Sequence, residues 1–119
     1  MQKELKILML EDNAYDAKLN IIQLNKGRIK FVHKLVDNKA DFIASLTEYQ
    51  PDIILSDFSL PQFTGLDALE IVKNKYPEIP FIMVTGSLDE ETAVLCMKQG
   101  AWDYVIKDHI VRLGPALKM

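Results

Sequence analysis

The segment Asp52–Gly65, which reads DIILSDFSLPQFTG, joins a short apolar run to a stretch rich in turn-forming residues. The run Asp52–Ser56 has the length of a strand and is rich in isoleucine and leucine, so we interpret it as a buried strand. Asp57 follows at once, and proline, threonine and glycine come soon after it, as is typical of turns. The segment therefore predicts a buried strand that presents one carboxylate at the mouth of a loop.

Other short apolar runs along the chain alternate with amphipathic stretches. With Asp52–Ser56, the expected strands are Leu5–Leu10, Ile29–Val36, Phe81–Val84 and Tyr104–Ile106. Helical spacing groups Ala17, Ile21 and Leu24; Phe42, Leu46 and Tyr49; Leu66, Leu69, Val72 and Tyr76; Ala93, Cys96, Met97 and Gly100; and, in a last helix from near His109, Ile110, Leu113 and Leu117. Because strands that are apolar throughout need cover on both faces, the alternation predicts a doubly wound α/β domain with a five-stranded parallel sheet.

Composition narrows the classes of protein that fit. A chain of 119 residues is expected to form one globular domain over residues 1–119. The net charge of −3 comes without a long basic run, so no direct nucleic-acid or anionic-membrane partner is expected. The apolar run Ile7–Leu10 is too short for a signal peptide or a membrane span, so no membrane insertion is expected. The single cysteine, Cys96, is interpreted as a buried apolar group, and a reducing, cytoplasmic setting is predicted.

Polar residues stand at the ends of four of the expected strands. The loops that leave the carboxyl ends of parallel strands gather at one edge of the sheet, where ligands commonly bind. The residues expected there are Glu11 and Asp12 after the first strand, Asp57 after the third, Thr85 after the fourth and Lys107 after the fifth. Three neighbouring carboxylates repel one another and require a cation.

Mg²⁺ and a phosphoryl group would together complete such a site. Mg²⁺ takes oxygen ligands and keeps several waters, which suits Asp12 and Asp57. Lys107 would neutralise one phosphoryl oxygen, and the Thr85 hydroxyl would donate a hydrogen bond to another. An aspartate oxygen is a known nucleophile in the formation of acyl phosphates, and such transfer depends mainly on positioning and charge neutralisation.

Four fragments in this order, LEDN, ILSDFSLPQFTG, IMVTGS and GAWDYVIKD, resemble the receiver domain of two-component response regulators. The similarity extends over essentially the whole chain, and it implies a flavodoxin-like (βα)5 fold with strand order 2-1-3-4-5. It implies that Asp57 accepts a phosphoryl group from a histidine kinase or a histidine phosphotransfer protein. Asp12, Asp57 and the backbone carbonyl of Ser59 would bind Mg²⁺ directly, and Glu11 would act through a bound water.

The resemblance also implies how the phosphorylated state is read. Thr85 and Lys107 would contact the phosphoryl group, and the Tyr104 ring would move inward as the Thr85 hydroxyl is drawn toward the phosphate. The surface of the fourth helix, fifth strand and fifth helix would then signal to a downstream effector or fused domain, or form a homodimer. Such a domain is not an enzyme with a separate substrate, but it promotes its own phosphorylation and dephosphorylation.

Some details concern this chain in particular. Receivers usually carry proline after the lysine, joined by a cis peptide, whereas this chain has Asp108. Because a cis bond before a non-proline residue costs about 2.5 to 4 kcal/mol, we predict a trans Lys107–Asp108 bond, with the Asp108 side chain capping the last helix. Ser59 and Ser87 supply no strong base, so the loss of phosphate is expected to be moderate to slow. The fragments VTGSLDEETAV and YVIKDHIVRL look most like receivers of hybrid sensor kinases.

Three other functions fit parts of the pattern. A Mg²⁺-dependent phosphohydrolase also uses an aspartyl nucleophile, but SDFSLP has no second aspartate two residues on and the chain has no length for a substrate-selecting cap. A flavodoxin-like cofactor binder would need a phosphate cradle where this chain has the acidic loop LEDNAYD. A constitutive interaction module that is never phosphorylated would have no need of these acids, Thr85 and Lys107.

Overall fold

Residues 3–86 and 90–118 are described by the structure, a computed structural model, in which strands and helices alternate along the chain. The elements are β1 (Leu5–Leu10), α1 (Ala14–Lys26), β2 (Phe31–Val36), α2 (Lys39–Glu48), β3 (Ile53–Asp57), α3 (Gly65–Lys75), β4 (Phe81–Thr85), α4 (Glu90–Lys98), β5 (Asp103–Ile106), the 3₁₀ helix η1 (Lys107–Arg112) and α5 (Leu113–Leu117). Each expected strand is present, with ends that differ by no more than two residues from the predicted ones.

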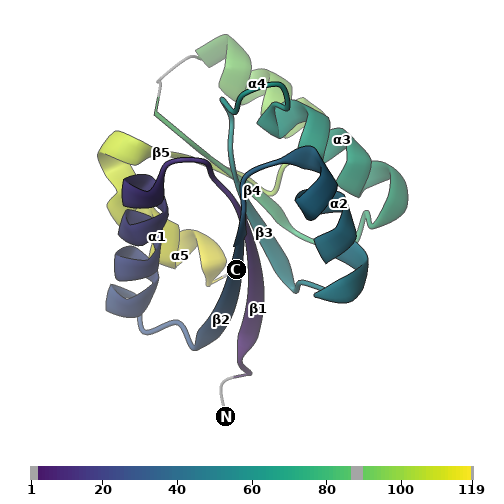
Figure 1. Ribbon diagram of the computed structural model, residues 1–119. Coiled ribbons are helices and arrows are strands. Elements are labelled where there is room, and N and C mark those ends of the chain that lie inside the picture. Colours follow the sequence, from purple (N-terminus) through teal and green to yellow (C-terminus); the bar gives the residue numbers. More distant parts are fainter. Residues whose placement is uncertain (1–2, 87–89, 119) are drawn as a thin grey trace.

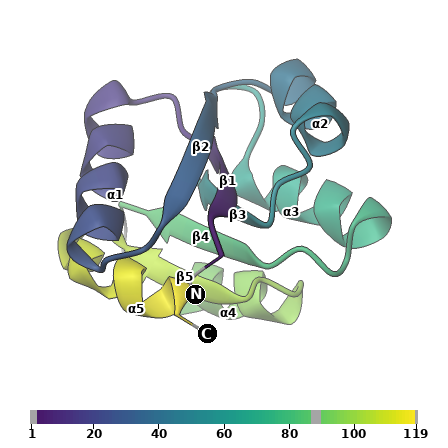
Figure 2. The ribbon, with the colours of Figure 1, turned by 90° about the horizontal axis from the view of Figure 1, so that it is seen from below.

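The strands form one parallel sheet in the order β2-β1-β3-β4-β5. Helices α1 and α5 cover one face of this sheet, and α2, α3 and α4 cover the other (Figures 1 and 2). The predicted doubly wound, flavodoxin-like fold and its strand order are therefore confirmed. Within the described ranges, no helix has the length and apolar character needed to cross a bilayer.

Side chains of the central strands alternate between two separate cores. In β1, Ile7 and Met9 pack with Leu24 and Leu113 under α1 and α5. Leu8 and Leu10 lie on the opposite face, in the core beneath α2, α3 and α4. All four β1 side chains are almost completely buried, and each such burial stabilises the fold by about 1.5 to 3 kcal/mol. The middle of the sheet therefore leaves no place for a charged side chain.

Strand β2 begins later than predicted and is only partly buried. The Ile29 amide donates to the Leu24 carbonyl at 3.1 Å, so residue 29 lies in the turn that follows α1 and not in the strand. Arg28 just before it has a left-handed backbone with φ of 59°, which turns the chain away from the helix axis. Because β2 is an edge strand, only Val36 is buried in it, and the expectation of a strand apolar on both faces fails there.

The last helix differs from the prediction in length. An α-helix was expected from near His109, but residues Lys107–Arg112 form 3₁₀ turns, and His109 has non-helical dihedral angles (φ −123°, ψ 43°). Regular α-helix begins only at Leu113, and Leu113 and Leu117 are buried as predicted. Helix α5 packs closely on the end of α1, where a Cβ added to Gly27 would lie 3.2 Å from the Gly114 Cα.

One predicted core position on α4 is wrong. Met97 was placed with Ala93 and Cys96 on the buried face, but its side chain is 47% exposed. Cys96 is the buried residue of this helix and Ala93 packs partly against the same core. The adjacent position lies about 100° further around the helix, and α4 buries only a narrow stripe, so Met97 faces outward.

Gly65 positions the loop that carries Asp57. Its amide donates to the Phe58 carbonyl at 2.8 Å, which draws the start of α3 against the end of β3. A Cβ at residue 65 would lie 2.5 Å from the Asp57 carbonyl oxygen and 2.6 Å from the Met83 sulfur. The site therefore requires a residue without a side chain at this point.

We predict that Gly65→Ala lowers the free energy of unfolding by about 1 to 3 kcal/mol, because the added methyl group forces the β3–α3 loop away from Asp57. Urea denaturation measures the change. Gly86→Ala is the matched control, since nothing lies within 4 Å of a Cβ at that position. A Gly65→Ala protein as stable as the Gly86→Ala protein would contradict the packing described here.

Candidate functional site

The register of the parallel strands brings the predicted polar residues to one edge. Leu10 lies beside Ser56, Asp57 beside Val84, and Thr85 beside Ile106. The strands thus end nearly level with one another, and the residues that follow β1 and β5 project from the same edge. The edge predicted from the sequence is therefore the one that gathers the acids, the threonine and the lysine.

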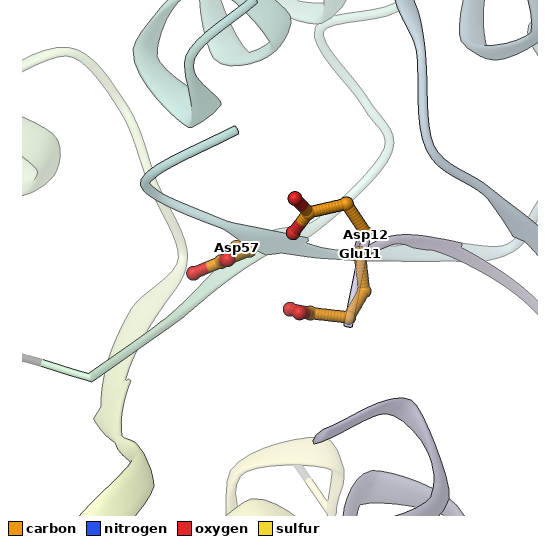
Figure 3. Close-up of side chains that lie close together, drawn as sticks. All are labelled: Glu11, Asp12 and Asp57. Atoms are coloured by element: carbon orange, nitrogen blue, oxygen red, sulfur yellow. The ribbon is translucent and has the colours of Figure 1, made fainter. Parts of the chain in front are cut away.

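Three carboxylates converge at this edge. One carboxylate oxygen from each of Glu11, Asp12 and Asp57 lies within 4.8 Å of the others. Figure 3 shows the Glu11 and Asp12 carboxylates directed toward the side on which Asp57 lies. Glu11 and Asp57 are buried, whereas Asp12 is exposed. Clustered hard oxygen donors with one open side fit the ligand set that Mg²⁺ and similar divalent cations require.

Lys107 inserts its ammonium among the acids. Its Nζ atom lies 2.7 Å from Asp16 Oδ2, 3.3 Å from Glu11 Oε2 and 3.5 Å from Asp57 Oδ1. The first two contacts are hydrogen bonds in which the ammonium donates. One cation therefore serves three carboxylates, and the cluster keeps an excess of negative charge.

Burial and mutual repulsion change the acidity of these groups. Burial, together with the negative charge of Asp57, raises the pKa of Glu11 from its ordinary value of 4.5 to about 7. Burial also raises the pKa of Asp57, although the nearby Lys107 and the Phe58 and Ser59 amides, which donate to this carboxylate, act in the opposite direction. Burial alone would lower the pKa of Lys107, but the hydrogen bond to Asp16 and the neighbouring carboxylates together raise it. A bound cation would relieve this repulsion.

Residues at the polar edge are divided between the two faces of the sheet. Glu11, Asp57 and Lys107 continue the rows of side chains that face α1 and α5, since Met9, Leu55 and Val105 precede them by two residues in that core. Thr85 follows Phe81 and Met83, which face α3 and α4. Tyr104 lies opposite Met83 on the adjacent strand and is buried on the same face. Thr85 and Tyr104 therefore share the face of the sheet opposite to that of Lys107.

Asp16 is a member of the site that the sequence analysis did not select. It stands third in α1, after the N-cap Asn13, in the position where an acid commonly caps its own helix. The pattern Asn-x-x-Asp therefore predicts a helix cap and conceals a second role. The position of Asp16 shortly after β1 was nonetheless informative, because the first turn of a helix that follows β1 must lie near the same sheet edge.

Other local predictions have mixed outcomes. No cis peptide occurs in the described residues, so the predicted trans bond between Lys107 and Asp108 is confirmed. The predicted cap by Asp108 is wrong, because the N-caps of η1 and α5 are Ile106 and Arg112, and neither start has a side-chain cap. Ser59 is exposed beside Asp57. Ser87 lies outside the described residues.

Comparison with known proteins identifies the family. Residues 7–114 match the family model of the response regulator receiver domain. The LuxO regulatory protein of Vibrio cholerae is 38% identical over 99 residues, which cover 83% of this chain. The crystal structure of the Mn²⁺-bound response regulator Rcp1 superposes with a TM-score of 0.77 at 23% identity, covering 93% of this chain and 90% of that one. The phosphorylated cyanobacterial phytochrome response regulator RcpA gives a TM-score of 0.78 at 25% identity, covering 98% and 90%.

This chain belongs to the response regulator receiver domain family, as the resemblance of its four fragments predicted. Receiver domains are signalling modules of two-component systems, which confirms the predicted class of protein. The match covers only 21% of the length of the Vibrio cholerae protein. The activity and partners of that longer protein therefore do not transfer directly to this chain.

In metal-free protein, we predict that the free energy of unfolding falls as the pH rises from about 4.5 to about 7. Over this range folded Glu11 holds a proton that the unfolded chain has released, so the native state binds more protons and alkali favours unfolding. Asp57 contributes in the same direction. Glu11→Gln is expected to flatten the profile and to stabilise the protein by up to about 3 kcal/mol above pH 7.

The measurement is urea denaturation in the presence of a chelator at several pH values. Glu48→Gln, which changes an exposed acid at the end of α2, is the control. It should leave the dependence of the free energy of unfolding on pH unchanged. An unchanged slope in the Glu11→Gln protein would show that Glu11 is ionised throughout this range.

Proposed function

We propose that the chain is the phosphoacceptor domain of a two-component phosphorelay and that Asp57 receives the phosphoryl group from phosphohistidine. The observation that carries this proposal is the Lys107 ammonium, which lies 3.5 Å from Asp57 Oδ1 at the edge where Glu11 and Asp12 also converge. An acceptor carboxylate, a cation for the transferred group and oxygen ligands for a metal are the parts that phosphoryl transfer requires. The family supports the same assignment.

The proposed metal ligands are Asp12, Asp57 and the Ser59 backbone carbonyl, with Glu11 acting through water. Mg²⁺ at this position would screen the repulsion between Asp57 and an incoming phosphoryl oxygen. The convergence of three carboxylates supports a divalent-cation site, and the related Rcp1 has been crystallised with Mn²⁺ bound. Asp12 is the exposed member of the cluster, so it offers the side from which a hydrated ion enters.

In the proposed transfer, one Asp57 oxygen forms a bond to phosphorus while the phosphorus–nitrogen bond of the donor histidine breaks. The electron pair of that bond remains on the imidazole nitrogen, and the product is an acyl phosphate on Asp57. The Phe58 and Ser59 amides orient the attacking carboxylate. Lys107 and the Thr85 hydroxyl then hold two oxygens of the phosphoryl group.

Thr85 and Tyr104 form the proposed switch. Thr85 ends β4 at the site, and Tyr104 lies on β5 on the same face of the sheet, already buried to 8% exposure. Movement of the Thr85 hydroxyl toward the phosphoryl group would therefore change the space available to the Tyr104 ring. Signalling to a downstream effector or fused domain would pass through α4, β5 and α5.

The proposal also specifies the extent of the domain, its location and its phosphoryl donor. We assign residues 1–119 to a single receiver domain in the cytoplasm, phosphorylated by a histidine kinase or a histidine phosphotransfer protein. The LuxO relative is a regulatory protein of which the matched region is 21%, which supports a role as one module of a larger regulator. A receiver within a hybrid sensor kinase stays a prediction.

The main test is incubation with Mg²⁺ and acetyl phosphate, followed by intact-mass spectrometry. We expect one phosphoryl group on the parent protein and none on Asp57→Asn, because the amide cannot act as the nucleophile. Asp67→Asn, which removes a carboxylate that caps α3, is the matched control and should be modified like the parent.

Two of the rival functions predict different results for the same purified protein. Repeated hydrolysis of a small phosphate ester would favour the phosphohydrolase. A parent that binds Mg²⁺ but is never modified would favour the constitutive module. Modification that persists in Asp57→Asn would exclude Asp57 as the acceptor.

The proposed output surface exposes several apolar side chains. They are Val94, Leu95 and Met97 on α4, Trp102 before β5 and Val111 in η1. Trp102 is 54% exposed and is the largest of them. Large exposed apolar side chains on these elements favour contact with a partner, which supports a homodimer or an effector contact here.

We predict that the phosphoryl mimic beryllium trifluoride, added with Mg²⁺, increases the dimer fraction measured by analytical ultracentrifugation. Trp102→Ser should weaken that dimer by at least tenfold, because tryptophan side chains buried at an interface commonly carry much of its binding energy. Tyr15→Ser is the control, since Tyr15 is 70% exposed but lies on α1. Equal effects of the two substitutions would place the interface elsewhere.

A further inference from the structure

The strongest contact of Lys107 is with a residue outside the proposed phosphoryl-transfer set. Its ammonium is 2.7 Å from Asp16 Oδ2, which is 0.8 Å closer than its approach to Asp57. Both partners of this ion pair are largely shielded, with side-chain exposures of 18% for Lys107 and 25% for Asp16. Because charge-assisted hydrogen bonds of this length are the strong ones, Asp16 holds the ammonium more firmly than Asp57 does.

The start of α1 is built so that the Asp16 carboxylate is available for this contact. The Asp16 amide donates to Asn13 Oδ1 at 3.1 Å, which is one half of a capping box. In the other half of a capping box, the amide of the N-cap residue would donate to the Asp16 carboxylate. Here the Asn13 amide donates instead to Glu11 Oε1, at 3.1 Å. Helix α3 provides the contrast, since Thr64 and Asp67 there complete both halves of the box. Asp16 is thus released from capping and is directed at Lys107.

Phosphorylation changes the demand for the same ammonium. A phosphoryl group on Asp57 adds oxygens that carry negative charge near the ammonium, and a hydrogen bond of about 2.8 Å from Lys107 to one of them would compete with the bond to Asp16. Lysine has a flexible stem, so the ammonium can move between partners at the same sheet edge. Movement toward the phosphoryl group weakens the 2.7 Å contact with Asp16.

We propose that Asp16 is a positioning residue that competes with the phosphoryl group on Asp57 for the Lys107 ammonium. This inference rests on the proposed function. In the unmodified domain Asp16 makes the shortest contact with the ammonium, which stays 3.5 Å from Asp57 Oδ1 and forms its weaker contact there. In the phosphorylated domain the same attraction lowers the affinity of the site for the phosphoryl group.

The test is equilibrium binding of beryllium trifluoride, a noncovalent phosphoryl mimic, measured by titration calorimetry at saturating Mg²⁺. Asp16→Asn keeps the shape of the side chain but removes its charge, so it should bind the mimic roughly three to ten times more tightly than the parent. Asp37→Asn is the matched control for general loss of charge, because Asp37 lines the same cavity as Glu11 and Asp12. It should change the affinity by less than about twofold.

A double-mutant cycle separates competition for Lys107 from other effects of the substitution. In a Lys107→Gln background, Asp16→Asn should change the affinity by less than about twofold, because there is no ammonium to release. An equal gain in both backgrounds would show a through-space charge effect and would overturn the proposal. Weaker binding by Asp16→Asn would also overturn it, since Asp16 would then be holding Lys107 in place for the phosphoryl group.

Acetyl phosphate labelling provides a second measurement that does not need the mimic. At steady state, Asp16→Asn should carry a larger phosphorylated fraction than the parent, and Asp37→Asn should match the parent. If the parent binds the mimic and is labelled on Asp57 while Asp16→Asn behaves identically, only the role of Asp16 is refuted. If the parent neither binds the mimic nor is labelled, both the proposed function and this inference are refuted.

Discussion

The structure depends on the burial of the central strands from both sides. Strands β1, β3 and β4 are enclosed between two layers of helices, and a charge placed in the middle of any of them would lose its hydration without compensation. Charged side chains are therefore kept out of the buried middle of these strands, and Asp57 and Thr85 occupy the last ladder positions of β3 and β4. The parallel register makes those positions level, so the requirements of the core also assemble the polar edge.

The electrostatics of that edge follow from the same burial. Glu11 and Asp57 are almost fully removed from solvent. The single positive charge of Lys107 is smaller than the total negative charge that these two groups, Asp12 and Asp16 carry when ionised. Burial raises the pKa values of both Glu11 and Asp57, and the negative charge of Asp57 adds to the effect on Glu11. A site with surplus oxygen donors and too little positive charge attracts divalent cations, which is consistent with the receiver family to which the chain belongs.

Sequence patterns were informative where one strong physical effect operates. Strand positions, the sheet class and the polar edge follow from apolar runs and from the residues that end them, because burial on both faces tolerates no alternative. Predictions were wrong where helical spacing was the main guide and the actual burial or backbone geometry differed from it. Met97 lies at the boundary of a narrow apolar stripe on α4, and residues Lys107–Arg112 satisfy helical spacing but form 3₁₀ turns. Asp16 satisfies a capping pattern, and only the distance to Lys107 reveals its ion pair. Long-range contacts of this kind join residues 91 positions apart, which local patterns do not encode.

The division of the polar edge between the two faces of the sheet has an evolutionary consequence. Lys107 and its acidic partners belong to the layer of α1 and α5, whereas Thr85 and Tyr104 belong to the layer of α3 and α4. Thr85 and Lys107 end adjacent strands and are proposed to hold the same phosphoryl group, so substitutions in the two layers share a ligand and are not additive. Selection on the affinity of such a domain for its ligand therefore also acts on the surface that its partners recognise, and a duplicated copy changes both properties together.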